Sequence, residues 1–155
     1  TFNVTGRWAE KNQELLLKIK GQGHEIGNHG HRHLDYAGLT YEENLEQIQT
    51  SKTIIEDVIK EPTKFFQAPS GSFGEGTIKA ANELGYTCIK WDIDTIDWKY
   101  REEPKVIIER VKKKDIQDNS IVLMHPTKAT TECIDDIIEI IRNKGLKPGK
   151  LSDVF

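Results

Sequence analysis

The chain has 155 residues, of which 36% are hydrophobic and 30% are charged, and its formal net charge is −3. This size and composition suit one compact domain with a hydrophobic core. No run of about 18 apolar residues is present, which excludes a transmembrane helix, and no cationic and then apolar leader marks a signal peptide at the start. Charges of both signs are interspersed, so the basic surface of a nucleic-acid-binding protein is absent. Cys88 and Cys133 have neither disulfide-framework nor zinc-site spacing and are expected to be buried thiols.

Strand-like and helix-like segments alternate along the chain. The sequence predicts strands over residues 1–5, 24–28, 63–68, 86–93, 121–124 and 150–154. It predicts helices over residues 9–20, after the capping-box pair Thr40 and Glu43, around 78–84, from Pro104 to Lys114, and around 134–141. The apolar run 121–124 is typical of a strand that is buried on both faces.

This alternation predicts an α/β fold with a parallel sheet and right-handed crossovers. Two architectures fit, an open doubly wound sheet and a barrel, and both place function at the carboxyl ends of the strands. No glycine-rich phosphate-binding loop follows a strand, which disfavours nucleotide binding. We expect residues 1–155 to form one domain.

Four of the five histidines follow the ends of predicted strands, which is the strongest indication of an active site. His29 and His33 come after the second strand, and they would share one face if the chain turned helically there. Two neutral imidazoles so placed can bind Zn²⁺ or a similar ion, although a catalytic site needs a third protein ligand. The alternative is a solvated polar turn, and His31 between them fits that interpretation.

His125 ends the apolar fifth strand, and Pro126 follows it. Imidazole gains and loses a proton near neutral pH, which suits proton transfer, whereas the alternative is a structural histidine. Three carboxylates, Asp92, Asp94 and Asp97, crowd the end of the fourth strand, where a carboxylate can orient a histidine or simply cap a turn. Trp98 offers a flat apolar wall for a sugar ring.

In its order of motifs the chain resembles the polysaccharide deacetylases, the NodB-homology domain of carbohydrate esterase family 4. His29 to His33 resembles the metal-binding His-(Ser/Thr)-x-x-His motif, with Gly30 in the Ser/Thr place. Residues 67–71, Gln-Ala-Pro-Ser-Gly, resemble the Arg-x-Pro-x-Gly motif of the groove wall. Residues 94–98 resemble Asp-x-x-Asp-Trp, and residues 123–125 resemble Leu-x-His.

The resemblance implies a distorted (β/α)7 barrel and removal of N-acetyl, or in some members O-acetyl, groups from a polysaccharide with a divalent metal ion. The metal implied is zinc, with cobalt or nickel as alternatives. Carried over by position, His29 and His33 would bind the metal, His125 would be the general acid and Asp97 would tune it. The substrate-binding residues would be Gln67, Pro69, Ser70, Gly71, Trp98 and Leu123.

Two departures from the family pattern bear on activity. The Thr-Phe-Asp-Asp-Gly motif, which supplies the base and a metal ligand, is absent, and Thr1 to Gly6 resembles the second barrel strand. We therefore expect a domain that lacks its first strand and helix, with that motif encoded upstream. In the family an arginine pairs with the base, and this chain has Gln67 at that position. Glutamine has neither the charge nor the forked donor geometry of arginine.

Three interpretations follow. The chain is a fragment of a metal-dependent deacetylase, or a catalytically impaired carbohydrate-binding relative, or a metal-dependent hydrolase of another class on a similar barrel. For the first, the expected partner is an acetylated glycan, with peptidoglycan preferred over chitin or xylan. The location implied is extracytoplasmic or cell-wall associated, and the oligomeric state stays open.

Overall fold

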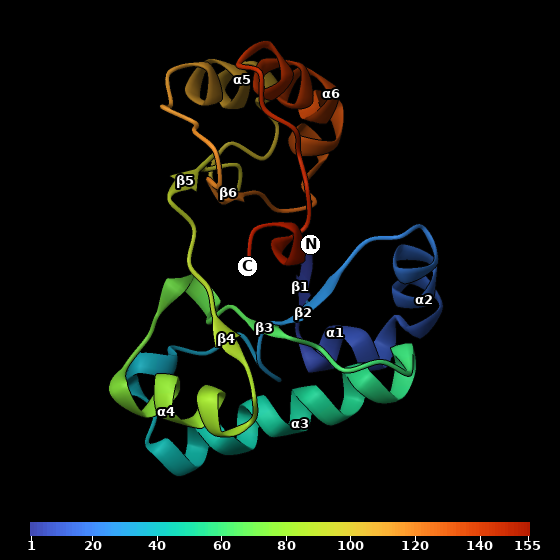
Figure 1. Ribbon diagram of the computed structural model, residues 1–155, viewed down its shortest axis with the longest axis vertical. Helices are drawn as coiled ribbons and strands as arrows, with labels where there is room; N and C mark the ends of the chain where they lie inside the picture. Colours follow the sequence, from blue (N-terminus) through green and yellow to red (C-terminus); the bar gives the residue numbers. More distant parts are fainter. The chain divides into compact units, whose positions relative to one another are not determined.

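The computed structural model describes residues 1–155, and its contacts divide the chain into two compact units (Figure 1). Unit 1 comprises Thr1–Lys90, Lys150–Asp153 and Phe155, and unit 2 comprises Trp91–Gly149 and Val154. The single domain over residues 1–155 stays a prediction. No helix has the length and apolarity needed to cross a membrane.

Unit 1 is built on a parallel sheet of four short strands. These are β1 (Phe2–Val4), β2 (Ile26–Asn28), β3 (Phe65–Phe66) and β4 (Thr87–Cys88), in the spatial order β1-β2-β3-β4. Phe2 pairs with Ile26, Asn28 with Phe66 and Phe65 with Thr87. Strands that follow one another in the sequence are therefore neighbours, with no reversal of order. A doubly wound sheet has such a reversal, so this topology is that of a (β/α) barrel.

The helices of unit 1 are α1 (Gly6–Lys11), α2 (Gln13–Gly21), α3 (Tyr41–Ile59) and α4 (Glu75–Glu83). The capping box predicted at the start of α3 is present: Glu43 N donates to Thr40 Oγ1 at 3.2 Å, and Thr40 N donates to Glu43 Oε2 at 2.8 Å. The single helix predicted over residues 9–20 is wrong, because the chain forms two helices that meet at Asn12. There the backbone leaves helical geometry, and Asn12 Nδ2 donates to Trp8 O at 2.8 Å.

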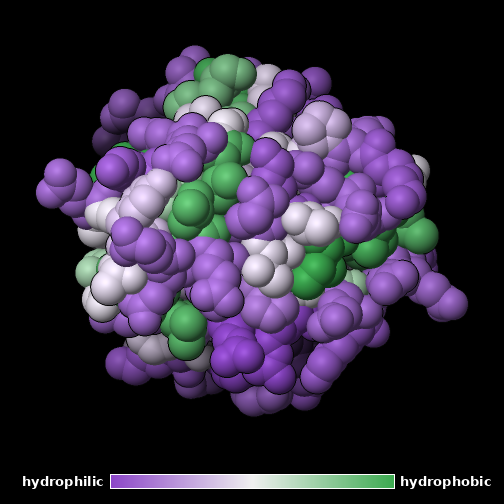
Figure 2. All heavy atoms as spheres, turned by 90° about the horizontal axis from the view of Figure 1, so that it is seen from below, coloured by the Kyte–Doolittle hydropathy of each residue, from purple (hydrophilic) through white to green (hydrophobic).

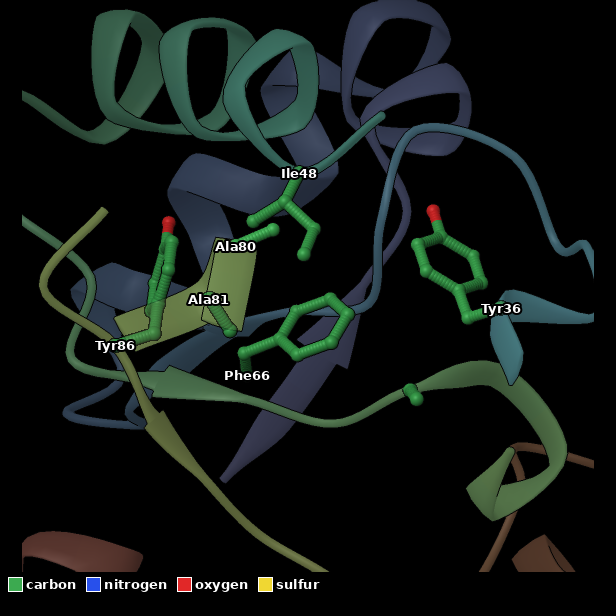
Figure 3. Packing of buried hydrophobic residues seen from close by; sticks show 7 residues of the cluster. Tyr36, Ile48, Phe66, Ala80, Ala81 and Tyr86 are labelled. Atoms are coloured by element: carbon green, nitrogen blue, oxygen red, sulfur yellow. The ribbon is translucent and has the colours of Figure 1, made fainter. Parts of the chain in front are cut away.

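Phe66 of β3 lies at the centre of the core of unit 1, shown in Figure 3. Its ring centroid is 5.8 Å from that of Tyr36 and 6.2 Å from that of Tyr86. Ile48 from α3, Ala68 after β3 and two alanines from α4 complete the cluster with side chains that are fully buried. The two alanines are small enough to let α4 approach both the sheet and α3.

Unit 2 contains a two-stranded parallel sheet and two helices that pack against each other (Figure 1). Its strands are β5 (Ile93–Asp94) and β6 (Val122–Leu123), with Ile93 opposite Val122 and Asp94 opposite Leu123. Its helices are α5 (Pro104–Lys112) and α6 (Lys128–Asn143), and Pro104 opens α5 as predicted. The buried residues of the two helices and of β5 form one core: Ile93, Ile107, Val111, Ala129, Cys133 and Ile137.

Three strand predictions need correction. The strand predicted over residues 86–93 is two strands, β4 and β5, which belong to different sheets. The run 121–124 is half-buried and not buried on both faces. The closing strand over residues 150–154 is wrong, because Leu151–Asp153 forms a 3₁₀ turn (η3). Lys150 N donates to Asp153 Oδ2 at 2.7 Å, and such local hydrogen bonds compete with strand pairing.

Hydrophilic residues cover most of the face seen in Figure 2, and the hydrophobic residues on it form small separate areas. This distribution agrees with a chain of which 30% is charged. Small scattered apolar areas are ordinary for a folded surface and indicate no binding site by themselves.

Candidate active site

The residues predicted to form the site follow the carboxyl ends of strands in both units. In unit 1, His29 follows β2 and Gln67 follows β3. In unit 2, Asp97 comes three residues after β5, and His125 comes two residues after β6. Each unit thus brings together one part of the predicted set.

The two imidazoles of unit 1 face each other. The ring centroids of His29 and His33 are 5.4 Å apart with the planes at 64°. The helical turn considered as a route to this arrangement is absent, because residues 29–33 form a bend and Gly30 has a φ of +74°. His29 Nδ1 lies 2.7 Å from the carbonyl oxygen of Gln67. A carbonyl only accepts, so Nδ1 carries the hydrogen and Nε2 holds the lone pair, which is the arrangement typical of a metal-binding histidine.

The buried side chain of Asn28, the residue before His29, fixes the carboxyl end of β2. Asn28 is fully buried, and its Nδ2 donates to Ile48 O at 3.2 Å and to the Tyr86 hydroxyl at 2.9 Å. Its Oδ1 accepts from Gly30 N at 2.7 Å. The chain directly before and directly after His29 is therefore anchored by one side chain with all its polar atoms paired.

Gly30 cannot be replaced by the Ser or Thr of the resembling motif without rearrangement. A Cβ at this position would lie 1.7 Å from the hydroxyl oxygen of Tyr36 and 2.4 Å from its Cζ. Tyr36 is fully buried, and burial raises the pKa of its hydroxyl. The aromatic ring and the glycine thus fit each other, and the positive φ also favours glycine.

The segment 67–71 predicted as a groove wall begins with a buried amide. Gln67 Oε1 accepts from Asn3 Nδ2 at 3.2 Å, and Gln67 N donates to Asn28 O at 3.0 Å. Pro69–Gly71 forms a 3₁₀ turn (η2), in which Pro69 and Gly71 are buried and Ser70 is exposed. Both partners in the Asn3–Gln67 contact are neutral, so this position supplies no cation.

In unit 2, Asp97 and His125 form a hydrogen-bonded pair. Asp97 Oδ1 lies 2.7 Å from His125 Nδ1, and Asp97 Oδ2 accepts from the backbone N of His125 at 2.5 Å. Asp97 is fully buried, and His125 is partly exposed. A carboxylate that accepts from Nδ1–H orients the ring and leaves Nε2 as the nitrogen that exchanges a proton with another molecule.

The environment of Asp97 favours its charged form. Burial acts to raise the pKa of this carboxyl, but the hydrogen bonds from His125 and Thr130 outweigh it, and the pKa is lowered from its ordinary value. Thr130 Oγ1 donates to Asp97 Oδ2 at 2.7 Å. Asp97 is thus an ionised, fully hydrogen-bonded partner for His125.

The other carboxylates at this strand end cap turns, the alternative that the sequence left open. Asp92 Oδ1 accepts from Ile121 N at 2.5 Å, and Asp94 Oδ1 accepts from Ile96 N at 2.8 Å. Ile96 has a φ of 55°, a strained conformation for a β-branched residue, next to Asp97. The strain is confined to the turn that carries Asp97 into its buried position.

The two residues predicted to receive the acetyl group also lie in unit 2. Trp98 follows Asp97 in the turn and is 54% exposed. Leu123 lies in β6 and is half-buried, and its carbonyl accepts from Thr95 Oγ1 at 2.9 Å. Their roles in substrate binding stay predictions.

The two histidines of unit 1 are suitable metal ligands by type, but two ligands are too few for a catalytic site. His29 has the required tautomer and faces His33, and both are nitrogen ligands of the type that zinc prefers. Within residues 1–155, no group of three His, Cys, Asp or Glu side chains converges enough to hold a metal ion. A catalytic site that uses this pair therefore needs a further ligand.

Sequence reasoning missed the residues that hold the site residues in place. Asn28, Tyr86 and Thr130 each contact a site residue or its neighbour through buried hydrogen bonds. Polar residues inside apolar segments, as at Asn28, are a usable signal, because a buried polar group needs a partner. The sequence gives no such indication for Thr130, because a threonine near the start of a helix is expected to be an ordinary helix cap.

Comparison with known proteins identifies the family of the chain. A family model described as polysaccharide deacetylase matches residues 1–89. The protein YlxY of Bacillus subtilis (strain 168), which is described as uncharacterized, is 38% identical over the whole chain. A peptidoglycan-N-acetylglucosamine deacetylase of Bacillus cereus is 29% identical, also over the whole chain. The chain spans 48% of the first of these relatives and 58% of the second.

Among solved structures, wild-type BA3943 from Bacillus anthracis is 37% identical to the chain, with a TM-score of 0.94 over 99% of this chain and 54% of that one. That protein is described as a CE4 family pseudoenzyme, and one mutant of it as having restored enzymatic activity. The likeness confirms the predicted carbohydrate esterase fold. Since the family model covers more than half of its residues, the chain belongs to the polysaccharide deacetylase family.

Proposed function

We propose that the chain takes part in hydrolysing N-acetyl groups of a cell-wall glycan, with peptidoglycan as the substrate class. The observation that carries this proposal is the Asp97–His125 pair, in which a buried carboxylate orients a partly exposed imidazole. A protein that only binds sugar has no need of an oriented acid. Several relatives are described as peptidoglycan deacetylases, among them proteins of Bacillus cereus and Bacillus subtilis (PdaA), and they support the choice of substrate.

In this mechanism the two histidine groups have separate tasks. His29 and His33 would hold a divalent ion, zinc or in its place cobalt or nickel, through Nε2 of His29 and a nitrogen of His33. When bound, such an ion supplies Lewis-acid polarisation of the amide carbonyl. Water would add to the amide carbonyl carbon and give its proton to a base, which the family motif absent from these residues supplies. As the carbon–nitrogen bond breaks, His125 delivers a proton from Nε2 to the departing amine. Asp97 accepts the hydrogen bond from Nδ1–H and stabilises the charged ring.

The remaining predicted residues would bind the sugar. Trp98 presents an exposed aromatic face on which a sugar ring can stack, and with Leu123 it would receive the acetyl methyl group. Gln67, Pro69, Ser70 and Gly71 would form one groove wall. Because the substrate class lies outside the cytoplasm, we place the protein in an extracytoplasmic, cell-wall-associated location.

A second function is favoured by a specific observation. Gln67 occupies the position at which the family motif has arginine. Its side chain forms a hydrogen bond with Asn3, which is neutral. A neutral amide cannot hold a catalytic base by charge. The likeness to a CE4 pseudoenzyme points in the same direction. The chain would then bind an acetylated glycan and leave it intact.

Acetate release and glycan binding, measured side by side on the purified protein, separate the two functions. For deacetylation we expect acetate from N-acetylated peptidoglycan fragments and loss of bound metal in His33→Ala. Glycan binding without acetate would support the second function. Stoichiometric metal retained in both His29→Ala and His33→Ala would contradict the metal site.

A further inference from the structure

The buried carboxylate of Asp97 accepts three hydrogen bonds, and only two of them come from His125. His125 Nδ1 lies 2.7 Å from Oδ1, and the backbone N of His125 lies 2.5 Å from Oδ2. The third is the hydroxyl of Thr130, 2.7 Å from Oδ2, which belongs to helix α6. Since Asp97 is fully buried, no exposed surface is left through which water could replace that donor.

The direction of every hydroxyl in this contact can be assigned. A carboxylate only accepts, so Thr130 gives its hydrogen to Asp97. Thr130 Oγ1 lies 2.8 Å from Thr127 Oγ1, and with its own hydrogen committed it accepts there from the Thr127 hydroxyl. Thr127 Oγ1 in turn accepts from Thr130 N at 3.1 Å as the cap of α6. The hydrogen bonds therefore run in one direction, from Thr127 through Thr130 to Asp97.

This arrangement fixes the orientation of the carboxylate. Oδ2 is held by two donors from different parts of the chain, a backbone N–H and the start of α6. Oδ1 is then left facing Nδ1 of His125. Rotation of the carboxylate would break all three bonds inside a buried site, which is costly for a charged group.

We propose that Thr130 is a positioning residue that holds the Asp97 carboxylate in place and thereby keeps the His125 hydrogen on Nδ1. The proposal deepens the proposed function, and it rests on that function only in treating His125 as the acid. Thr130 is buried and acts through Asp97. It lies outside the motifs that resemble the family. Through the carboxylate of Asp97 it connects Thr127, the cap of α6, to His125.

The test compares Thr130→Val, which keeps the side-chain shape and removes the donor, with Thr130→Ser, which keeps the donor. Thr131→Val is the matched control, because Thr131 Oγ1 donates to Thr127 O at 2.9 Å and makes no bond to Asp97. Nitrogen chemical shifts of the His125 ring report its tautomer, and the carboxyl carbon shift of Asp97 reports its pKa. Thr130→Ala makes the same deletion with a smaller side chain should the valine variant fail to fold.

We expect the Nδ1–H tautomer to predominate in the wild type, Thr130→Ser and Thr131→Val. In Thr130→Val or Thr130→Ala, loss of a donor to the charged form should raise the pKa of Asp97 by about one unit and increase the share of the other tautomer. On a glycan substrate kcat should fall about tenfold with KM unchanged. An Asp97 pKa and a His125 tautomer equal to those of the wild type would overturn the proposal. Absence of acetate release by the wild type would overturn the proposed function but leave the two spectroscopic results standing.

Discussion

At the scale of single residues, the candidate site depends on close fits that no motif describes. Gly30 and Tyr36 are the clearest pair, because the tyrosine hydroxyl occupies the place where any side chain at position 30 would begin. The departure of this chain from the Ser/Thr of the family motif therefore has a steric reason. The same fit shapes the bend that brings His29 and His33 together.

Replacing Gly30 with alanine should cost far more stability than replacing a glycine of similar φ elsewhere. Gly85 is the matched control, since its φ is +80° and nothing lies within 4 Å of a Cβ built there. Gly85→Ala should cost about 1 kcal/mol for the left-handed conformation alone. Gly30→Ala adds a clash with a buried ring and should cost at least about 3 kcal/mol in urea unfolding. Equal losses in the two variants would contradict the steric role of Tyr36.

At the scale of elements, buried hydrogen bonds link the carboxyl end of β2 to the amino ends of β3 and β4. Tyr86, just before β4, accepts from Asn28 Nδ2 at 2.9 Å. Thr63 gives its hydroxyl hydrogen to Glu56 Oε1 at 2.9 Å, so the Tyr86 hydroxyl donates to Thr63 across 2.7 Å. The Tyr86 hydroxyl thus links the end of β2, next to His29, to the residues that precede β3 and β4.

Removing that hydroxyl should destabilise the protein. Tyr86→Phe leaves two buried polar groups short of a partner and should cost about 1–3 kcal/mol. Tyr41→Phe is the control, because the Tyr41 hydroxyl donates to Glu83 at an exposed position, and it should change the free energy of unfolding little. Urea unfolding of both variants checks this expectation, and equal stability of Tyr86→Phe and the wild type would contradict it.

The α/β class and the order of elements were predictable because apolar periodicity and caps are local signals. The box at Thr40 and the proline at the start of α5 behave as their chemistry requires. The break at Asn12 and the division of residues 86–93 were not predictable, because hydrogen bonds and tertiary pairing override the local pattern there. Among the site residues, the histidines were visible from their positions, whereas Thr130 and Tyr86 depend on contacts with residues distant in the sequence.

At the scale of the whole molecule, two carboxylates link stability to pH. The pKa of Asp97 is lowered in the folded state for the reasons given above. Burial acts to raise the pKa of Glu25, but hydrogen bonds from Ser152 and Thr1 outweigh it and lower that pKa too. A carboxylate with a lowered folded pKa contributes stability above its unfolded pKa, about 4 for these side chains, and that contribution is lost as pH falls through the folded value.

The free energy of unfolding, as far as these two groups determine it, should be level above about pH 5 and fall as pH is lowered from there toward about 2. Urea unfolding at a series of pH values checks this. Asp97→Asn should be less stable at neutral pH and should show a shallower fall on acidification. A slope in Asp97→Asn as steep as that of the wild type would contradict the linkage assigned to Asp97.

The central claim is that His125, oriented by Asp97, is the acid of a glycan deacetylase. The most direct measurement is the initial rate of acetate release from N-acetylated peptidoglycan fragments by the wild type, His125→Ala and His24→Ala. His24 is an exposed histidine outside both groups of site residues. We expect release by the wild type and His24→Ala, and a loss of at least about 100-fold in His125→Ala with bound metal unchanged. Equal rates in all three proteins, or glycan binding with no acetate from any of them, would contradict the claim.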